Sequence, residues 1–380
     1  MNAFTSDVSH ERVGHVGLIT LNRPQALNAL SLAMVRELTQ VLINWQHDPQ
    51  VWVVAVRGSN KQGPFGTFCA GGDIRYFHQA ALAGDVSLED FFTEEYSLNH
   101  LIQNYPKPYI AFMDGIVMGG GMGISQGAAW RMVTERTLMA MPETQIGLFP
   151  DVGGGYFLSR CPGHSGEYLA LTGQVLHGAD ALAVGLADVC VPSGFLPELW
   201  QSLSSPSWHS AEALLAGMHA HVARIQAANA LPNPISPSWQ DPQIDTVFAL
   251  PCVSDIVHSL TDLAAGQSEC WASQTLQALR DRSPLMLAVS LEQIRRGRQL
   301  SLADDLRMER DLVRRCFHTE HLNRRGSQSE TVEGIRALAI DKDRQPQWQP
   351  LRIEDVTPEM VLPFFVSPWP AQSHPLRDLA

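Results

Sequence analysis

Two carboxylates stand out because the sequence around them holds almost no other charge. Glu143 and Asp151 are the only charged residues among the 23 positions between Arg136 and Arg160, and apolar side chains flank both. Burial without a cation raises the pKa of a carboxyl group, and a second acid nearby raises it further. Such a pair is suited to general acid–base or nucleophilic chemistry near neutral pH. We therefore expect both acids to be catalytic.

Each acid also has a structural interpretation. Asp151 could cap the helix that is expected to follow it. Glu143 could serve as a structural carboxylate that accepts backbone N–H groups. A third candidate, Glu95, lies beside Glu94 in the helix-like stretch 91–105, where a solvated face is the alternative to a pocket position.

Three glycine clusters cover residues 69–73, 118–123 and 151–155. The first two each follow a strand-like run and open a helix, so both offer unpaired backbone N–H groups at the positive end of a helix dipole. Two such junctions could hold one oxygen that gains negative charge, which is an oxyanion hole. The alternative is that the glycines only permit tight packing. A dinucleotide fingerprint and a Walker A lysine are both missing from the clusters.

A competing pattern is GISQG at residues 123–127, which satisfies the nucleophile-elbow motif G-x-S-x-G. An elbow serine follows a strand directly, whereas here glycines 119–123 already occupy the turn. We therefore expect Ser125 to lie inside a helix, with a serine esterase as a minor alternative. Cys69 has no histidine beside it in the sequence and is expected to be a small buried hydrophobic residue.

The composition bounds the partners and the compartment. A net charge of −12 and a pI of about 5.6 argue against nucleic-acid binding. The six cysteines are scattered without CxxC spacing, which favours a reducing compartment, and no metal site is expected. We find neither a signal-like N-terminus nor an apolar run long enough for a membrane span. A cytoplasmic protein without membrane contact is the expectation.

Strand-like and helix-like runs alternate to about residue 192, which predicts an α/β architecture. Strands are expected over 13–21, 51–58 and the start of 109–130, with two more over 131–141. Helices are expected over 31–45, 91–105, 210–230 and most of 244–340, whereas the Pro-rich stretch 231–243 cannot be a helix interior.

With 380 residues, the chain should form one large domain with an extension, or two domains. We predict a catalytic core over 1–200, a helical region packing on it over 201–345, and a Pro-rich tail over 346–380. The seven prolines after Asp341 predict an ordered coil for this last part.

Several segments resemble the crotonase, or enoyl-CoA hydratase/isomerase, superfamily. They are FCAGGDI (68–74), MGGGMG (118–123) and PETQIGLFPDVGGGYFL (142–158). Together with EEYSLN (94–99), RMERDL (307–312) and EGIRALAIDKDRQPQWQP (333–350), the last segment is most similar to the 3-hydroxyisobutyryl-CoA hydrolase branch. The resemblance implies a crotonase-like spiral of ββα units with a helical C-terminal extension.

The resemblance also implies roles for individual residues. The N–H groups of Gly72 and Gly120 correspond to those that hold the thioester oxygen of acyl-CoA. Glu143 corresponds to the glutamate beside the thioester, while Asp151 and Glu95 correspond to acids of the acyl pocket.

Residues Ala70, Asp73 and Ile74 correspond to loop positions that contact the adenine and pantetheine parts of CoA. Typical hydratases carry a second catalytic glutamate where this sequence has Gly123. Hydration of a double bond by paired glutamates is therefore disfavoured.

The function implied is hydrolysis of 3-hydroxyisobutyryl-CoA, a step of valine breakdown, with CoA as part of the substrate and no cofactor. The alternatives are an enoyl-CoA hydratase or isomerase, and a CoA-ester-binding protein without turnover. Superfamily members associate as trimers or hexamers, but the helical extension could replace subunit contacts, so a monomer is also compatible.

Overall fold

The computed structural model describes residues 6–229, 242–266 and 270–380. The fold divides into two compact units that both draw on distant parts of the sequence. Unit 1 comprises Met1–Gly72, Leu98–Met139 and Val175–Pro237, and unit 2 comprises Asp73–Ser97, Ala140–Gln174 and Ser238–Ala380. The domain boundaries expected near residues 200 and 345 stay predictions.

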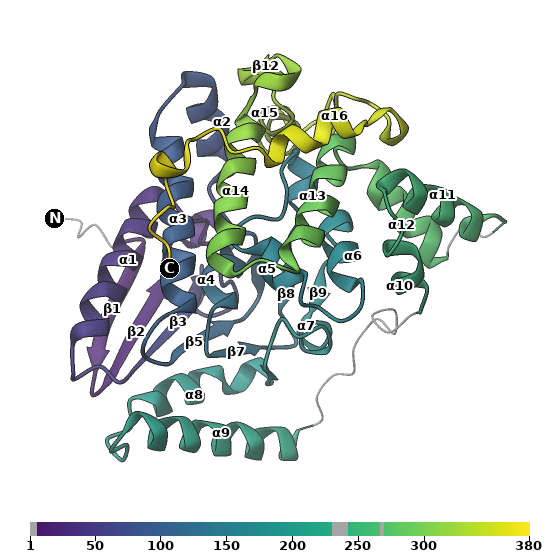
Figure 1. Cartoon of the computed structure of the whole chain (residues 1–380). Coiled ribbons are helices and arrows are strands. Elements are labelled where there is room, and N and C mark those ends of the chain that lie inside the picture. Colours follow the sequence, from purple (N-terminus) through teal and green to yellow (C-terminus); the bar gives the residue numbers. More distant parts are fainter. Residues whose placement is uncertain (1–5, 230–241, 267–269) are drawn as a thin grey trace. The chain divides into compact units, whose positions relative to one another are not determined.

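Unit 1 contains the strands of the protein's main sheet and the helices between them (Figure 1). Its strands are β1 Val8–Val13, β2 Val16–Leu21, β3 Val53–Asn60, β4 Gly63–Pro64, β5 Tyr109–Met113, β6 Ile116–Met118, β7 Trp130–Val133, β8 Leu138–Ala140 (whose last residue falls in unit 2), β9 Leu176–His177 and β10 Val189–Cys190. Its helices are α1 Leu32–His47, α4 Gly120–Gln126, α7 Gly178–Ala183, α8 Leu196–Leu203 and α9 Ala211–Ala228.

The described residues form a seven-stranded sheet in the order β1-β2-β3-β5-β7-β10, with β4 added to β3. The pairs from β2 to β10 are parallel, while β1 and β2 are antiparallel. The strand expected over 13–21 is confirmed as β2, but it begins at Val16, because Gly14 takes a positive φ of 58° and turns the chain between β1 and β2. The signal for β1 was weak, since five of its six residues are exposed.

Local sequence explains why the other expected elements of unit 1 form. The Ser31 hydroxyl accepts a hydrogen bond from Met34 N–H and so caps α1. Strand β5 is an uninterrupted apolar run, buried throughout, as parallel central strands require. The two strands expected over 131–141 are confirmed as β7 and β8.

Unit 2 is mainly helical. Its helices are α2 Ile74–Ala83, the first part of α3 Ser87–Gln103, α5 Gly154–Leu158, α6 Ser165–Thr172, α10 Pro242–Phe248, α11 Val253–Ala264, α12 Trp271–Arg280, α13 Pro284–Gly297, α14 Leu302–Phe317, α15 Glu330–Ile335 and α16 Pro358–Val361. The short strands β11 His318–Thr319 and β12 Arg324–Arg325 form a hairpin. Helices α13 and α14 both pack against the short helix α5 (Figure 1).

The helices expected in the second half of the sequence are confirmed where they are described. Ser283 and Ser301 cap α13 and α14 by accepting backbone N–H groups. The Pro-rich stretch 231–243 lies outside the described residues except for its last two positions, with which α10 begins. The C-terminal tail contains α16 and short 3-10 turns rather than continuous coil.

In the described ranges, each helix is too short or too polar to cross a lipid bilayer.

Candidate active site

Unit 1 brings the first two glycine clusters together. Residues Cys69 and Val117 form a parallel bridge, and Met118 N–H donates to the Cys69 carbonyl at 3.0 Å. Helix α4 then begins at Gly120, directly after β6. A Cβ atom added to Gly71 would lie 3.6 Å from the Gly120 nitrogen, so the two turns are in direct contact.

Two features of these turns require glycine. Gly119 has a φ of 47° with ψ of −121°, a backbone conformation that side chains disfavour. A Cβ atom on Gly121 would lie 2.4 Å from the Cys69 carbonyl oxygen. These glycines thus permit close packing, which is compatible with a role for their N–H groups.

Among the described residues, neither Gly72 N–H nor Gly120 N–H donates a hydrogen bond. Gly120 is the first residue of α4, so its N–H is one of those that a helix leaves unsatisfied. Gly72 is partly exposed. Both N–H groups are therefore available to an acceptor, as an oxyanion hole requires.

The loop residues matched to CoA contacts lead from the Gly72 turn into α2. Ala70 N–H donates to the Leu27 carbonyl at 3.0 Å, and the Asp73 carboxylate accepts Tyr76 N–H at 3.3 Å as the cap of α2. Ile74 is the first residue of that helix. Asp73 thus has a structural role, while contact of these residues with CoA stays a prediction.

Unit 2 brings the three candidate acids together in a buried cluster. Glu143 opens a 3-10 turn after β8, Asp151 precedes α5, and Glu95 comes from α3. Their exposed fractions are 7%, 6% and 2%. The solvated-face alternative for Glu95 is therefore wrong.

Hydrogen bonding distinguishes the three carboxylates. The Tyr96 hydroxyl donates to Asp151 Oδ2 at 2.8 Å, inside the protein. Among the described residues, Glu143 Oε2 and Glu95 Oε1 are buried and have no hydrogen-bond partner. A buried carboxylate oxygen without a donor is unfavourable for structure alone. The structural alternative for Glu143 is weakened, because one of its oxygens bonds nothing in the described fold.

Burial and mutual repulsion change the pKa values of these three acids. Burial, and then repulsion from Asp151, raise the pKa of Glu143 and of Glu95 well above the ordinary range. Burial raises the pKa of Asp151 to about 6, although the Tyr96 hydrogen bond opposes this by favouring the charged form. No cation of the described residues is among the causes acting on these three acids. Asp151 is therefore poised to exchange a proton near neutral pH, while the protonated forms of Glu143 and Glu95 are favoured by their burial.

The helix-cap alternative for Asp151 is also contradicted. The cap residue of α5 is Gly153, which has no side-chain cap bond at that position. The N–H groups of Gly153 and Gly155 instead donate to the Glu309 carboxylate. The Asp151 side chain therefore does not cap α5 and accepts the Tyr96 hydroxyl instead.

Ser125 lies inside α4, as expected. It is fully buried, and its hydroxyl donates to the Gly121 carbonyl at 2.8 Å and to the Met122 carbonyl at 3.2 Å. A hydroxyl bonded back to its own helix is not an elbow nucleophile. Within the described ranges, no cluster of histidine, cysteine or acidic residues has the makeup of a metal site.

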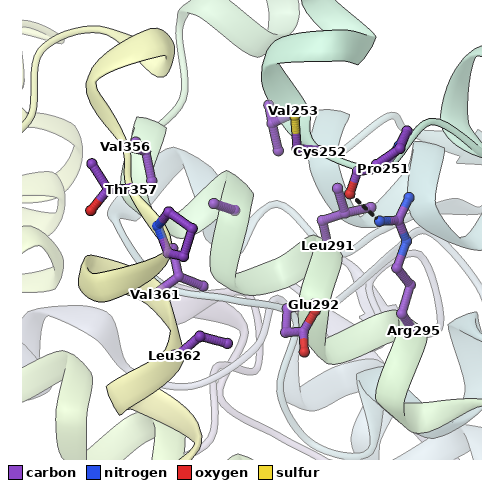
Figure 2. A pocket seen from close by; sticks show the side chains of 12 residues that line it. Pro251, Cys252, Val253, Leu291, Glu292, Arg295, Val356, Thr357, Val361 and Leu362 are labelled. Carbon is purple, nitrogen blue, oxygen red and sulfur yellow. Dashed lines mark hydrogen bonds between the residues drawn. The ribbon is translucent and has the colours of Figure 1, made fainter.

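A cavity of about 200 Å³ in unit 2 lies among residues of the C-terminal region (Figure 2). Leu291 of α13, Val253 of α11 and Val361 of α16 contribute apolar walls, and Arg295 donates to the Pro251 carbonyl at its edge. Neither the acid cluster nor any residue of the 142–155 segment lines this cavity. It is thus separate from the candidate acids.

A family model described as enoyl-CoA hydratase/isomerase matches residues 16–365. The chain belongs to the enoyl-CoA hydratase/isomerase family. Solved structures of the family agree: a carnitinyl-CoA dehydratase from Mycobacterium thermoresistibile is 36% identical, with a TM-score of 0.82 over 98% of this chain and 99% of that one. An enoyl-CoA hydratase from Rhodobacter sphaeroides is 36% identical, with a TM-score of 0.79 over 96% and 98%. The crotonase-like fold expected from the sequence is confirmed.

Curated relatives within the family carry one recurring name. The mitochondrial 3-hydroxyisobutyryl-CoA hydrolase of Gallus gallus is 39% identical over 94% of this chain and 88% of the relative. The corresponding protein of Xenopus tropicalis is 40% identical over 94% and 88%. A probable 3-hydroxyisobutyryl-CoA hydrolase of Arabidopsis thaliana is 38% identical over 96% and 92%.

Sequence reasoning missed three polar residues around Asp151. Tyr96 follows Glu95 directly and was passed over as an ordinary helix residue. Gln293 and Glu309 lie in α13 and α14, far along the sequence, and both are fully buried. The signal for Glu309 was its spacing: it shares a helix face with the buried residues Asp305, Leu312 and Cys316.

Proposed function

We propose that this protein hydrolyses the thioester of 3-hydroxyisobutyryl-CoA and releases free CoA. The observation that carries the proposal is the match, at 38–40% identity over 94% or more of the chain, to relatives named as hydrolases of this thioester. The buried acids of unit 2 supply groups that such a reaction needs. Valine breakdown is the expected context.

The carbonyl oxygen of the thioester is assigned to the N–H groups of Gly72 and Gly120. Attack on a thioester carbon places negative charge on this oxygen, and preorganised N–H donors stabilise that charge. Both N–H groups are unused within the described fold, which supports the assignment. Removal of one such donor typically lowers the rate by about 10²–10³.

Glu143 is assigned to the attack on the carbonyl carbon. Its unpartnered oxygen either takes a proton from water as general base or attacks directly to give a mixed anhydride. A single turnover in ¹⁸O-labelled water detects an anhydride that water opens at the glutamyl carbon. General-base catalysis places the label in the first acid product, whereas water attack on the glutamyl carbon of an anhydride leaves the first product unlabelled.

Asp151 is assigned to the substrate's 3-hydroxyl group and to proton delivery to the departing thiolate. A pKa of about 6 allows this carboxyl group to hold and release a proton under physiological conditions. Glu95, buried beside it, is assigned to the wall of the acyl pocket.

Backbone donors and carboxylates suffice for this reaction, so the proposal includes no cofactor. A cytoplasmic location is proposed from the scattered cysteines, while the vertebrate relatives are named mitochondrial. Sedimentation analysis would distinguish a trimer, a hexamer and a monomer.

The second candidate is an enoyl-CoA hydratase. Two solved structures at 36% identity carry the titles dehydratase and hydratase. Against it, Gly123 occupies the position matched to the second hydratase glutamate.

A panel of thioesters, assayed with the purified protein, distinguishes these activities. Thiol release is followed with a thiol reagent on 3-hydroxyisobutyryl-CoA, isobutyryl-CoA and crotonyl-CoA. The proposal expects the fastest release from the first compound. Loss of crotonyl-CoA without thiol release would assign the protein to the hydratases, and tight binding without either reaction would leave a CoA-ester-binding protein.

A further inference from the structure

The backbone immediately after Asp151 is strained. Val152 has a φ of 56°, a left-handed conformation that is a genuine outlier for a β-branched residue. Gly153 follows with a φ of 89°. Such conformations persist only where the surrounding structure holds them, and they occur preferentially at functional sites.

Two side chains from the C-terminal helices hold this turn from both ends. Glu309 of α14 accepts Gly153 N–H at 2.7 Å and Gly155 N–H at 2.9 Å. Gln293 of α13 donates its Nε2 to the Pro150 carbonyl at 2.6 Å and to Glu309 Oε1 at 3.0 Å. Asp151 and Val152 therefore lie between two anchored peptide groups.

The third glycine cluster makes these contacts possible. A Cβ atom on Gly155 would lie 2.3 Å from Asp305 Oδ1, and one on Gly297 of α13 would lie 2.2 Å from the Gly155 carbonyl oxygen. Helices α13 and α14 thus approach the backbone of the turn more closely than any side chain there would allow. The turn cannot relax without disturbing both helices.

We propose that Glu309 and Gln293 are positioning residues, which hold the strained turn so that the Asp151 carboxyl group meets the substrate. Neither residue touches the reacting atoms in this scheme. The catalytic consequence rests on the proposed function of Asp151, whereas the control of the Asp151 position rests only on the contacts above.

The residue pair Glu309 and Asp305 offers a matched comparison. Both are fully buried carboxylates one turn apart on α14, and both accept N–H groups at the start of α5. The Glu309 carboxylate accepts three hydrogen bonds with its two oxygens. In Glu309→Gln, a single amide oxygen takes their place, so an anchoring bond is lost. In Asp305→Asn, the amide oxygen can still accept Tyr156 N–H, which lies 2.8 Å from Asp305 Oδ2.

A double-mutant cycle tests whether Glu309 acts through Asp151. We expect Glu309→Gln to lower kcat/KM for 3-hydroxyisobutyryl-CoA by about 10–100-fold in the wild-type background, but by less than about 3-fold when Asp151→Asn is already present. Asp305→Asn should stay within about 3-fold of wild type. Fold losses that multiply in the double mutant would overturn the proposal, because a general structural effect would not depend on Asp151. Gln293→Leu provides a second route if Glu309→Gln does not fold.

A measurement without turnover separates this proposal from the proposed function. The side-chain carboxyl resonance of Asp151 is observed by ¹³C NMR and assigned by its disappearance in Asp151→Asn. The proposal expects it to shift or broaden in Glu309→Gln and in Gln293→Leu, and to stay unchanged in Asp305→Asn. An unchanged Asp151 resonance in both Glu309→Gln and Gln293→Leu would overturn the positioning role. A wild-type protein that releases no thiol would overturn the function alone.

Discussion

Replacing Asp151 with asparagine should make the protein more stable while it impairs catalysis. Asp151 is 6% exposed, and its carboxylate accepts one hydrogen bond from Tyr96, which an asparagine carbonyl oxygen can also accept. The substitution therefore keeps the shape and the bond but removes a charge from an apolar environment. Stability should be gained only where that charge would exist.

The sign and size of the gain follow from the pKa of Asp151. The pKa of Asp151 in the folded protein, about 6, lies above the ordinary aspartic acid value of 3.8, mainly because of burial. The folded protein then binds the proton more tightly than the unfolded chain, so the free energy of unfolding falls as the pH rises from about 4 through 6. A difference of about two pKa units corresponds to about 3 kcal/mol above pH 6. For a chain of this length, that free energy raises Tm by about 3–4 °C.

Thermal unfolding at pH 8 and at pH 4 measures this effect. Asp151→Asn should exceed wild type in Tm at pH 8, and the difference should vanish at pH 4. Asp262→Asn is the matched control, because the Asp262 side chain is 72% exposed, and it should change stability by less than about 0.5 kcal/mol. A variant that is less stable than wild type at pH 8 would refute the reasoning, since it would mean that the fold favours the charged form of Asp151.

Three further outcomes test other parts of the site. Gly120→Pro removes the N–H group at the first helical position, where proline is tolerated, so kcat for thiol release should fall by about 10²–10³. Gly120→Ala keeps the N–H group and should lose much less activity. Ser125→Ala should keep kcat within about 3-fold of wild type, because the hydroxyl bonds only its own helix; loss of activity would revive the esterase alternative. The pH profile of kcat/KM should show an inflection near pH 6 that is missing in Asp151→Asn. In Tyr96→Phe, the charged form of Asp151 loses a hydrogen-bond donor, so this inflection should move to higher pH.

The sequence was most informative where local patterns decide the structure. Glycine clusters predicted the turns before α4 and α2, and the apolar setting of Glu143 and Asp151 predicted their burial. These properties depend on neighbours along the chain. The periodicity of residues 31–45 predicted α1 for the same reason.

Properties that arise from contacts between residues far apart in the sequence could not be predicted from local patterns. Glu309 lies 156 residues beyond Gly153, to which it is bonded, and nothing local marks that pairing. Glu95 was ambiguous because Glu94 stands beside it in the sequence. Only the packing of α3 buries Glu95 and leaves Glu94 partly exposed. Strand β1 was missed because its exposed face lacks the apolar pattern that identifies strands.

The catalytic role of Glu143 is tested most directly by Glu143→Gln, assayed for thiol release from 3-hydroxyisobutyryl-CoA with the Kd of a non-hydrolysable analogue measured in parallel. The substitution keeps the size of the side chain but cannot take a proton from water or form an anhydride. We predict that kcat falls by about 10³ or more while the Kd of the analogue changes by less than about 3-fold. Thiol release at a rate within tenfold of wild type would contradict the account.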